Sequence, residues 1–469
     1  MTAVASIVSQ SSSDGQTSSS SPAEGSTRRL AQWIAGLDNA AVSASAFEWA
    51  THVTLDWLAV TIAGASEPLV HMLKEEAASN DGAAASYGKQ PLCDATRVGA
   101  WQAALINGAT GHALDFDDVS ARMHGHPSVP VLPAALAVAQ LRAVSGRDFL
   151  RGVVVGHEAQ ARIGEVLGDS HYARGFHATG TIGAFGAAAA AATLLGLDAE
   201  RTAHALGLAA TQAAGLKSMF GSMAKPLHAG KAAMNGLMAA QLAARGFTAN
   251  TDAIECFQGF AWTQADEVVP LQAIDTRDGF AIEETLFKYH AACYLTHSTI
   301  EAVRELRLRL NANVDDMESL EIVVPPGHLS VCDIAEPRTG LNVKFSIRQL
   351  ALLALDGADT AALDLYVDRT AQNPRYAQAR ERVRVTPTKL EHRHAAQVTL
   401  CTRDGQTHVA QANVGVPSTD PAAQWQRLTQ KARAIAAPVL GQARFERLHA
   451  QVSALTQSPS VTPLMEILQ

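Results

Sequence analysis

The sequence predicts a mainly α-helical protein, in which a large helical domain, discontinuous in sequence, carries a smaller inserted α+β domain. Alanine-rich stretches with apolar residues at helical spacing run from Leu30 to about Asp275. From Ile282 to about Val416 the pattern changes to short β-branched runs bounded by proline, glycine and aspartate. Helical spacing returns at Asp420, so we expect the C-terminal segment to pack back on the first domain.

The chain of 469 residues is too long for one simple core, which makes two domains the default. A Ser-rich segment precedes the first helical pattern and lacks the apolar stretch of a secretory signal, so we expect a disordered tail. The predicted divisions are the tail, the helical domain, the α+β domain and the returning helical segment, at residues 1–29, 30–281, 282–416 and 417–469.

Apolar spacing and capping residues place the helices of the large domain. Pro127, Pro130 and Pro133 are expected to break the backbone before one helix, and Asp148 and Asp198 to cap two others. One helix consists mostly of glycine and alanine, which suits close packing inside a bundle. The predicted helices cover 30–37, 46–62, 101–114, 134–144, 149–166, 180–195, 199–213, 425–436 and 444–455.

The small domain is predicted from strand-like runs that end at turn-forming residues. Pro325 and Pro326 end the first run, and Asp404-Gly405 is a hairpin signal between the last two. The predicted strands cover 320–324, 382–385, 396–402 and 408–414, with short helices at 350–355 and 363–367.

Composition excludes several classes of protein. The formal net charge of −8, without a basic stripe or tail, argues against nucleic acid as a partner. No apolar run reaches the roughly 20 residues that a membrane span needs. The cysteines are odd in number and lack C-x-x-C spacing, which argues against a disulfide scaffold and for a reducing compartment. We expect a cytoplasmic protein, with a mitochondrial location left open; the cysteines are Cys93, Cys256, Cys293, Cys332 and Cys401.

The stretch 111–128, GHALDFDDVSARMHGHPS, gathers costly polar groups in an alanine-rich context. Carboxylates and imidazoles are rarely concentrated among apolar residues without a chemical role. The stretch contains Asp115, Asp117, Asp118, His112, His124 and His126.

Two other interpretations of this stretch are purely structural roles and a metal site. Asp117 and Asp118 would be solvated or would cap a turn, and His112 would interact with a helix dipole. A zinc site from Asp115, His124 and His126 requires an extended backbone between the two histidines, and nothing else in the sequence suggests a metal. We therefore predict no metal and no cofactor.

Further unusual polar residues are concentrated in three other segments. Two of them open predicted helices, whose free N–H groups suit a carboxylate, and the third lies near the domain boundary, where ligand sites are common. These segments are 174–180 with Arg174 and His177, 223–231 with Lys225, His228 and Lys231, and 288–297 with Lys288, His290, Cys293 and His297. Lys217, Lys231, His392 and His394 are also explained as ordinary surface residues.

At these segments the chain resembles the MmgE/PrpD family, which includes 2-methylcitrate dehydratase, cis-aconitate decarboxylase and iminodisuccinate epimerase. The similarity extends from about Leu30 to the C-terminus. Its motifs here are His112-Ala-Leu-Asp115-Phe-Asp-Asp118, His126-Pro-Ser128, His177 before a Gly/Ala helix, Lys225-Pro-Leu-His228, Lys288 with Thr296-His297, and Gly340-Leu-Asn-Val-Lys344-Phe-Ser346.

The resemblance implies a helical domain, a smaller α+β lid, a homodimer and a cofactor-free site between the domains. It assigns catalysis to Asp115, His126, His177 and Lys225. The residues assigned to substrate binding are Ser120, His228, Lys288, Cys293 and Lys344.

Three features depart from the family pattern. Val119-Ser120 follows the acidic pair where decarboxylase-like members carry Thr, and Cys293 replaces their His. Arg348-Gln349 after Ser346 is also unusual. The leading hypothesis is a lyase that dehydrates or decarboxylates a small polycarboxylate. The alternatives are an epimerase of a dicarboxylic amino or imino acid, such as iminodisuccinate, and a catalytically altered relative.

All the family reactions form a carbanion or enolate next to a carboxylate, so cations are needed where charge develops. We expect Lys225, Lys217, Arg174 and Lys288 to converge on the substrate. His126 and His177 would share the acid and base roles, with Asp115 orienting one imidazole.

Overall fold

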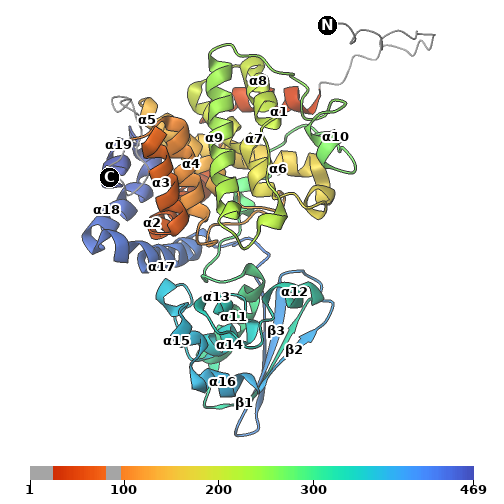
Figure 1. Cartoon of the computed structure of the whole chain (residues 1–469), viewed down its shortest axis with the longest axis vertical. Helices are drawn as coiled ribbons and strands as arrows, with labels where there is room; N and C mark the ends of the chain where they lie inside the picture. Colours follow the sequence, from red (N-terminus) through yellow and green to blue (C-terminus); the bar gives the residue numbers. More distant parts are fainter. Residues whose placement is uncertain (1–24, 81–96, 469) are drawn as a thin grey trace, which may run out of the picture.

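The computed structural model describes residues 25–80 and 97–468 and confirms the mainly α fold with a small sheet. Figure 1 shows a large helical body above a smaller body that holds the sheet. Most of the expected Ser-rich tail, residues 1–24, lies outside the described residues. Its predicted end at Arg29 is wrong, because helix α1 already begins at Ser26 and the Thr27 hydroxyl donates to Glu255.

The helical body is built around α7, whose neighbours are α5, α6, α8 and α9. A Cβ on Gly236 of α9 would lie 2.5 Å from the Ala187 Cβ of α7, so the glycine permits the close approach. Helix α7 is long and apolar enough to cross a membrane, but 94% of it is buried inside the protein, as in a core helix. The helices are α1 (Ser26–Gly36), α2 (Ala44–Gly64), α3 (Pro68–Asn80), α4 (Ala100–His112), α5 (Ser128–Leu141), α6 (Gly146–Ala173), α7 (Ala178–Leu195), α8 (Ala199–Ala210), α9 (Ala224–Ala244) and α10 (Phe260–Gln264).

Two local predictions for this body are wrong. Helix α5 starts at Ser128 and includes Pro130 and Pro133. Pro130 lies in the first turn, where backbone N–H groups have no helical partner, so it costs no hydrogen bond there. Helix α6 is capped by Ser145, whose hydroxyl accepts from the Asp148 amide, rather than by Asp148 itself. The Asp198 cap of α8 is confirmed.

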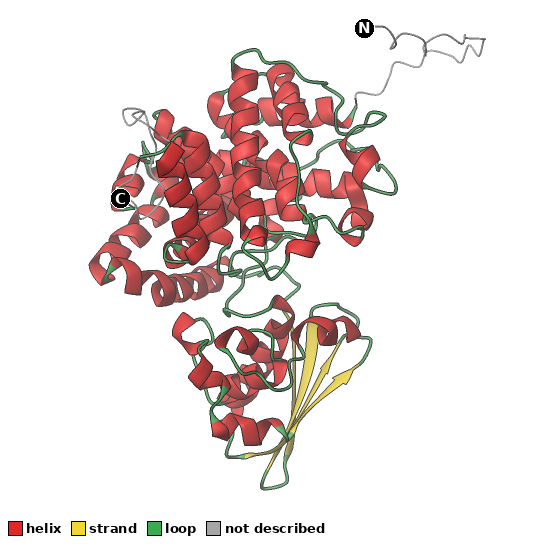
Figure 2. Cartoon of the chain, in the orientation of Figure 1, coloured by secondary structure: helices red, strands yellow, loops and turns green. Residues whose placement is uncertain are grey.

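The smaller body holds a four-stranded sheet with the order β2-β1-β3-β4. Strand β1 pairs parallel to β2 and antiparallel to β3, with Ile322 opposite Val385 and Val398. Figure 2 shows helices on one side of the sheet, where α11 packs on β3 and β4. The strands are β1 (Met317–Val324), β2 (Val383–Pro387), β3 (Ala395–Thr402) and β4 (Thr407–Asn413).

Short helices complete this body. The helix predicted at 363–367 is only a 3₁₀ turn, Leu363–Leu365, because Tyr366 turns inward and its hydroxyl donates 2.7 Å to the Thr360 carbonyl. The helices are α11 (His297–Leu310), α12 (Leu329–Cys332), α13 (Gly340–Val343), α14 (Ile347–Leu355), α15 (Asp368–Ala371) and α16 (Pro374–Arg380).

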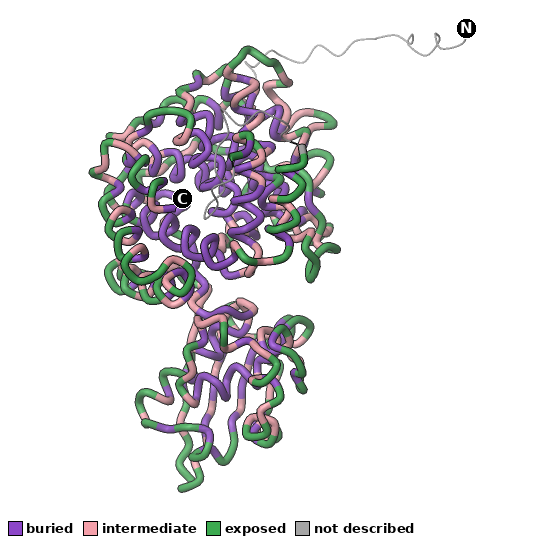
Figure 3. Tube along the Cα trace, turned by 60° about the vertical axis from the view of Figure 1, so that its left-hand side comes forward, coloured by how far each residue is buried: buried purple, intermediate pink, exposed green. Residues whose placement is uncertain are grey.

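The chain then returns to the helical body through α17 (Pro421–Leu440), α18 (Gln442–Ser453) and α19 (Thr462–Ile467). Helix α17 packs against α2, as the sequence predicted for the C-terminal segment. Figure 3 shows the buried trace concentrated inside each body and an exposed outer layer. Each body therefore has its own interior, and α17 ties the end of the chain to its beginning.

Candidate active site

The functional side chains come from four segments that meet where the two bodies face each other. Helix α4 ends at His112 and leads into the loop that carries Asp115 and Asp117. This loop is joined to the segment before Lys288 by paired backbone bonds between Val119 and Leu286, of 2.7 and 2.8 Å. The N-termini of α7 and α9 supply the other two segments.

Asp115 lies between two ammonium groups. Its Oδ1 atom is 2.9 Å from Nζ of Lys225 and 2.9 Å from Nζ of Lys288, which also donates to the Asp115 carbonyl at 2.7 Å. Burial opposes ionisation of Asp115, but the two lysines outweigh it and hold the pKa of this carboxyl well below its usual range. Lys288 is 4% exposed, whereas 44% of the Asp115 side chain remains open to solvent. A substrate carboxylate reaching Asp115 would therefore meet two fixed cations.

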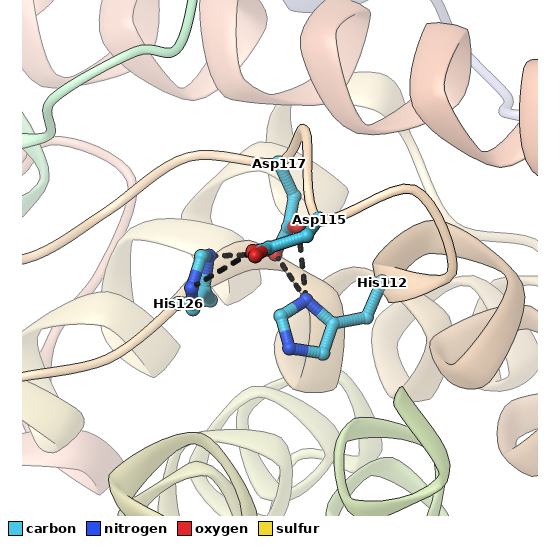
Figure 4. A group of neighbouring side chains, drawn as sticks. All are labelled: His112, Asp115, Asp117 and His126. Carbon is cyan, nitrogen blue, oxygen red and sulfur yellow. Dashed lines mark hydrogen bonds and ion pairs between the residues drawn. The ribbon is translucent and has the colours of Figure 1, made fainter. Parts of the chain in front are cut away.

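Asp117 links two imidazoles (Figure 4). His112 Nδ1 lies 2.9 Å from both Asp117 oxygens, and His126 Nδ1 lies 3.0 Å from Oδ2. Burial opposes ionisation of Asp117, but His112 and His126 keep its pKa well below the usual range. The other nitrogen of His126 lies 3.6 Å from Asp115. Asp117, rather than the predicted Asp115, makes the close contact that fixes the imidazole.

His177 occupies the N-cap position of α7 and is buried. Its Nδ1 lies 3.0 Å from Nδ1 of His228, its ring stacks on His112 with centroids 5.8 Å apart, and Phe220 meets it edge-on at 5.0 Å. Burial, reinforced by neighbouring cations, lowers the pKa of His177 far below its usual value. His177 is therefore neutral at neutral pH and presents an uncharged imidazole to the site.

Two buried carboxylates lie behind the loop. Asp118 accepts from the Ser128 hydroxyl at 2.5 Å, and that hydroxyl lies 3.1 Å from Nε2 of His157. Asp56 of α2 pairs at 2.6 Å with Lys431 of α17. Burial raises the pKa of Asp118 well above its usual value. The alternative that Asp117 and Asp118 are exposed to solvent is wrong, since both side chains are buried.

Lys431 also touches the loop that carries Asp115 and Asp117. Its ammonium donates 2.7 Å to the carbonyl of Phe116, the residue between Asp115 and Asp117, and lies 4.0 Å from the Phe116 ring centroid. Sequence reasoning missed this lysine, because nothing in the local pattern around residue 431 distinguishes it from other helical lysines.

The remaining predicted site residues lie around this centre. The Cys293 amide donates 2.9 Å to the Lys344 carbonyl. A hydrogen bond from the thiol of Cys332 to the sulfur of Cys293 lowers the pKa of Cys293, and both cysteines are free. Burial lowers the pKa of Lys344, and Asp115 lies close enough to act on it. Ser120 closes the turn before His126 through backbone bonds with Gly125.

Two of the four cations expected to converge point elsewhere. Arg174 pairs with Asp266 at 3.3 Å, and Lys217 lies 3.7 Å from the ring centroid of Tyr172 and donates to its carbonyl. Arg174 is held by residues that follow α10 and Lys217 by a residue near the end of α6, so of these four cations Lys225 and Lys288 are the ones that meet at Asp115. His124 likewise pairs with Asp169, at 2.8 Å, and stays outside the cluster.

One group of described residues has the chemistry of metal ligands. His112, Asp115, Asp117 and His126 offer donor atoms within 4.8 Å of one another. The ammonium groups of Lys225 and Lys288 each lie 2.9 Å from Oδ1 of Asp115. A divalent cation bound to that oxygen would therefore lie next to two positive charges. Like charges at that distance repel strongly in a partly buried site, so these residues fit a metal ion poorly.

Removal of metal ions should accordingly leave turnover unchanged, within about 20% by our estimate, because Lys225 and Lys288 already supply the positive charge. The measurement compares protein dialysed against EDTA with untreated protein and with protein given Zn²⁺ or Mg²⁺. Activity lost on dialysis and restored by one metal would contradict this interpretation of the cluster.

The buried histidines predict acid sensitivity. Burial lowers the pKa of His112 to about 4 and that of His157 to about 3. A histidine in the unfolded chain titrates near 6.5. Below about pH 6.5 the unfolded chain therefore binds protons that the folded protein does not bind, and this favours unfolding. The contribution of each of these two histidines should be complete above pH 6.5 and fall by up to about 1.4 kcal/mol per pH unit as the pH drops towards the lowered pKa. Burial lowers the pKa of His52, His171, His177 and His394 as well, so these histidines steepen the total slope.

Urea denaturation at pH 7, 6 and 5 measures this slope. His157→Gln removes one of these buried titrating groups and should reduce the slope by about 1.4 kcal/mol per pH unit. A variant slope equal to that of the parent protein would mean that His157 takes up its proton in the folded state.

The model of the MmgE/PrpD N-terminal domain matches residues 28–267, and that of the MmgE/PrpD C-terminal domain matches residues 290–457. The chain belongs to the MmgE/PrpD family. The matched regions contain the Asp115 loop, His177 and Lys225 in the first model and Cys293 in the second.

Three curated proteins named for cis-aconitate decarboxylation are similar to this chain over different lengths. A cis-aconitate decarboxylase of Aspergillus terreus is 27% identical over 97% of this chain and 98% of its own length. A cis-aconitate decarboxylase-like protein of Aspergillus oryzae is 31% identical over 61% of this chain and 63% of its own. Human cis-aconitate decarboxylase is 32% identical over 45% of each.

Proposed function

We propose that this protein is a cofactor-independent lyase that decarboxylates a small polycarboxylate of the cis-aconitate type. The observation that carries the proposal is the pair of ammonium groups, Lys225 and Lys288, fixed at one point beside the His112–Asp117–His126 array. Support also comes from the A. terreus decarboxylase, which is similar over nearly the whole of both chains.

The proposed chemistry follows from charge. When the bond between the substrate carbon and its carboxylate breaks, CO₂ leaves and the electron pair stays on the carbon skeleton as an allylic carbanion. Lys225 and Lys288 stabilise the remaining carboxylates and the developing charge. One proton must then be delivered to the carbanion, so a trianionic substrate gives a dianionic product and CO₂.

His126 is the proposed proton donor. Its Nδ1 atom pairs with Asp117, and its Nε2 atom faces Asp115, whose side chain is partly open to solvent. Neutral His177 and its partner His228 would orient the substrate from the opposite side, at the N-terminus of α7.

Dehydration of a 2-methylcitrate-like substrate would use the same cations and the same histidines, so it is the second candidate function.

Proton NMR of chelator-treated protein in D₂O tests the proposal, with cis-aconitate, 2-methylcitrate and iminodisuccinate in separate tubes. Vinyl signals of itaconate from cis-aconitate would support decarboxylation. New vinyl signals from 2-methylcitrate alone would show that the reaction is a dehydration and not a decarboxylation. Exchange of an α-proton in iminodisuccinate without a new skeleton would establish the epimerase alternative, for which we find no supporting contact.

A further inference from the structure

A cavity of about 420 Å³ lies at the junction of the two bodies, and none of the residues in the Asp115–Asp117 cluster lines it. Its walls come from α11, from the turn after α14 and from α17. Helices α11 and α14 belong to the smaller body and α17 to the helical body. Its volume falls within the range of about 300–1,000 Å³ that small-molecule sites occupy.

The cavity is strongly basic. Its lining includes Arg304, Arg307, Arg427 and Lys431, against a single acidic residue, Asp359. This concentration of positive charge is unusual in a protein whose formal net charge is −8. Such a cavity focuses a positive field and raises the local concentration of anions.

Two of these cations are balanced within the protein. Arg427 donates 2.6 Å to Glu301 and stacks 3.8 Å from the Tyr289 ring centroid, and Lys431 pairs with Asp56. The guanidinium groups of Arg304 and Arg307, in contrast, make no hydrogen bond or ion pair in the part of the chain that the structure describes, and Arg304 acts on Glu301 only at longer range. Their guanidinium groups therefore keep all their donors for a ligand.

One of these guanidinium groups lies close to Gly357. This glycine follows α14 with a φ of +77°, and a Cβ added there would lie 2.5 Å from three guanidinium atoms of Arg307. The missing side chain therefore leaves room for the Arg307 guanidinium at the cavity wall.

We propose that this cavity binds a small multivalent oxyanion, either a phosphate ester or a polycarboxylate, through Arg304 and Arg307. Planar guanidinium groups match both kinds of anion with paired N–H···O bonds. The anion would lie against α11 of the smaller body, on the side that faces α17, at a point separate from the Asp115–Asp117 cluster. This site does not depend on the proposed reaction.

Isothermal titration calorimetry at low ionic strength tests the site, with inorganic pyrophosphate as one ligand and citrate as the other. Four proteins are compared: the parent chain, Lys225→Met, the double variant Arg304→Gln/Arg307→Gln, and Arg309→Gln. Arg309 lies on the same helix outside the cavity and pairs with Glu305, so it is a matched control for lost charge. Circular dichroism establishes that each variant is folded.

The proposal expects a pyrophosphate or citrate site that persists in Lys225→Met and Arg309→Gln and weakens about 10–100-fold in the double variant. A second citrate site that Lys225→Met removes would belong to the Asp115 cluster. The ligand that binds more tightly identifies the class, phosphate ester or polycarboxylate. Equal affinity in the double variant and the parent chain would overturn the proposal. Loss of binding in Lys225→Met would also overturn it, because the anion would then occupy the catalytic cluster.

Discussion

Replacing His126 with alanine should lower the turnover number by about 10²–10⁴-fold, the range typical of a lost general acid or base. The imidazole is fixed by Asp117 at 3.0 Å and faces the oxygen of Asp115 that both lysines approach. Steady-state kinetics with the substrate identified by NMR measures the change. A KM that stays within about threefold would place the loss in the chemical step rather than in binding.

His124→Asn is the matched control for that variant. His124 lies two residues away, has a φ of 53°, which asparagine tolerates, and pairs with Asp169 outside the cluster. Its turnover should stay within about twofold of the parent protein, since no proton-transfer group is removed. Near-normal turnover of His126→Ala would remove His126 from the mechanism and leave His177 as the candidate.

Replacing Lys431 with methionine should destabilise the protein by about 3–5 kcal/mol, because it leaves Asp56 buried without its counter-charge. The pair is 2.6 Å apart and both side chains are 1% exposed. The same change removes the donor to the Phe116 carbonyl, so the loop that carries Asp115 and Asp117 loses an anchor. Urea denaturation measures the first effect and turnover the second.

The double variant Asp56→Leu/Lys431→Met separates these two effects. Replacing both partners of a buried pair with apolar groups often restores stability. It does not restore the hydrogen bond to Phe116, so we expect turnover to remain at least about tenfold low while stability recovers. Full recovery of both would show that Lys431 acts on folding alone.

Much of the fold follows from local patterns in the sequence. The helical spacing of the first domain, the Asp198 cap and the strand-like runs near residues 320 and 398 all depend on neighbours within a few positions. Proline positions are an exception to this local rule, because a proline disrupts a helix only when it lies beyond the first turn, and the sequence pattern does not fix where α5 starts. Pro130 is harmless only because α5 begins at Ser128.

The site was predicted less completely, for physical reasons. Which of two nearby carboxylates holds an imidazole depends on the loop conformation, and Asp115 has a φ of 51° that turns it towards the lysines. That turn leaves Asp117 facing His112 and His126. Arg174 and Lys217 are occupied by partners close to them in the folded chain, which charge counting cannot detect.

The bond from Lys431 to Phe116 spans 315 residues of sequence. During synthesis the ribosome makes the Asp115–Asp117 loop long before it makes the helix that supports it, and domains generally fold in the order in which they emerge. The cluster around Asp117 can be completed only when almost the entire chain has left the ribosome. A nascent or C-terminally truncated chain would thus hold every proposed catalytic residue and still lack this support for the loop.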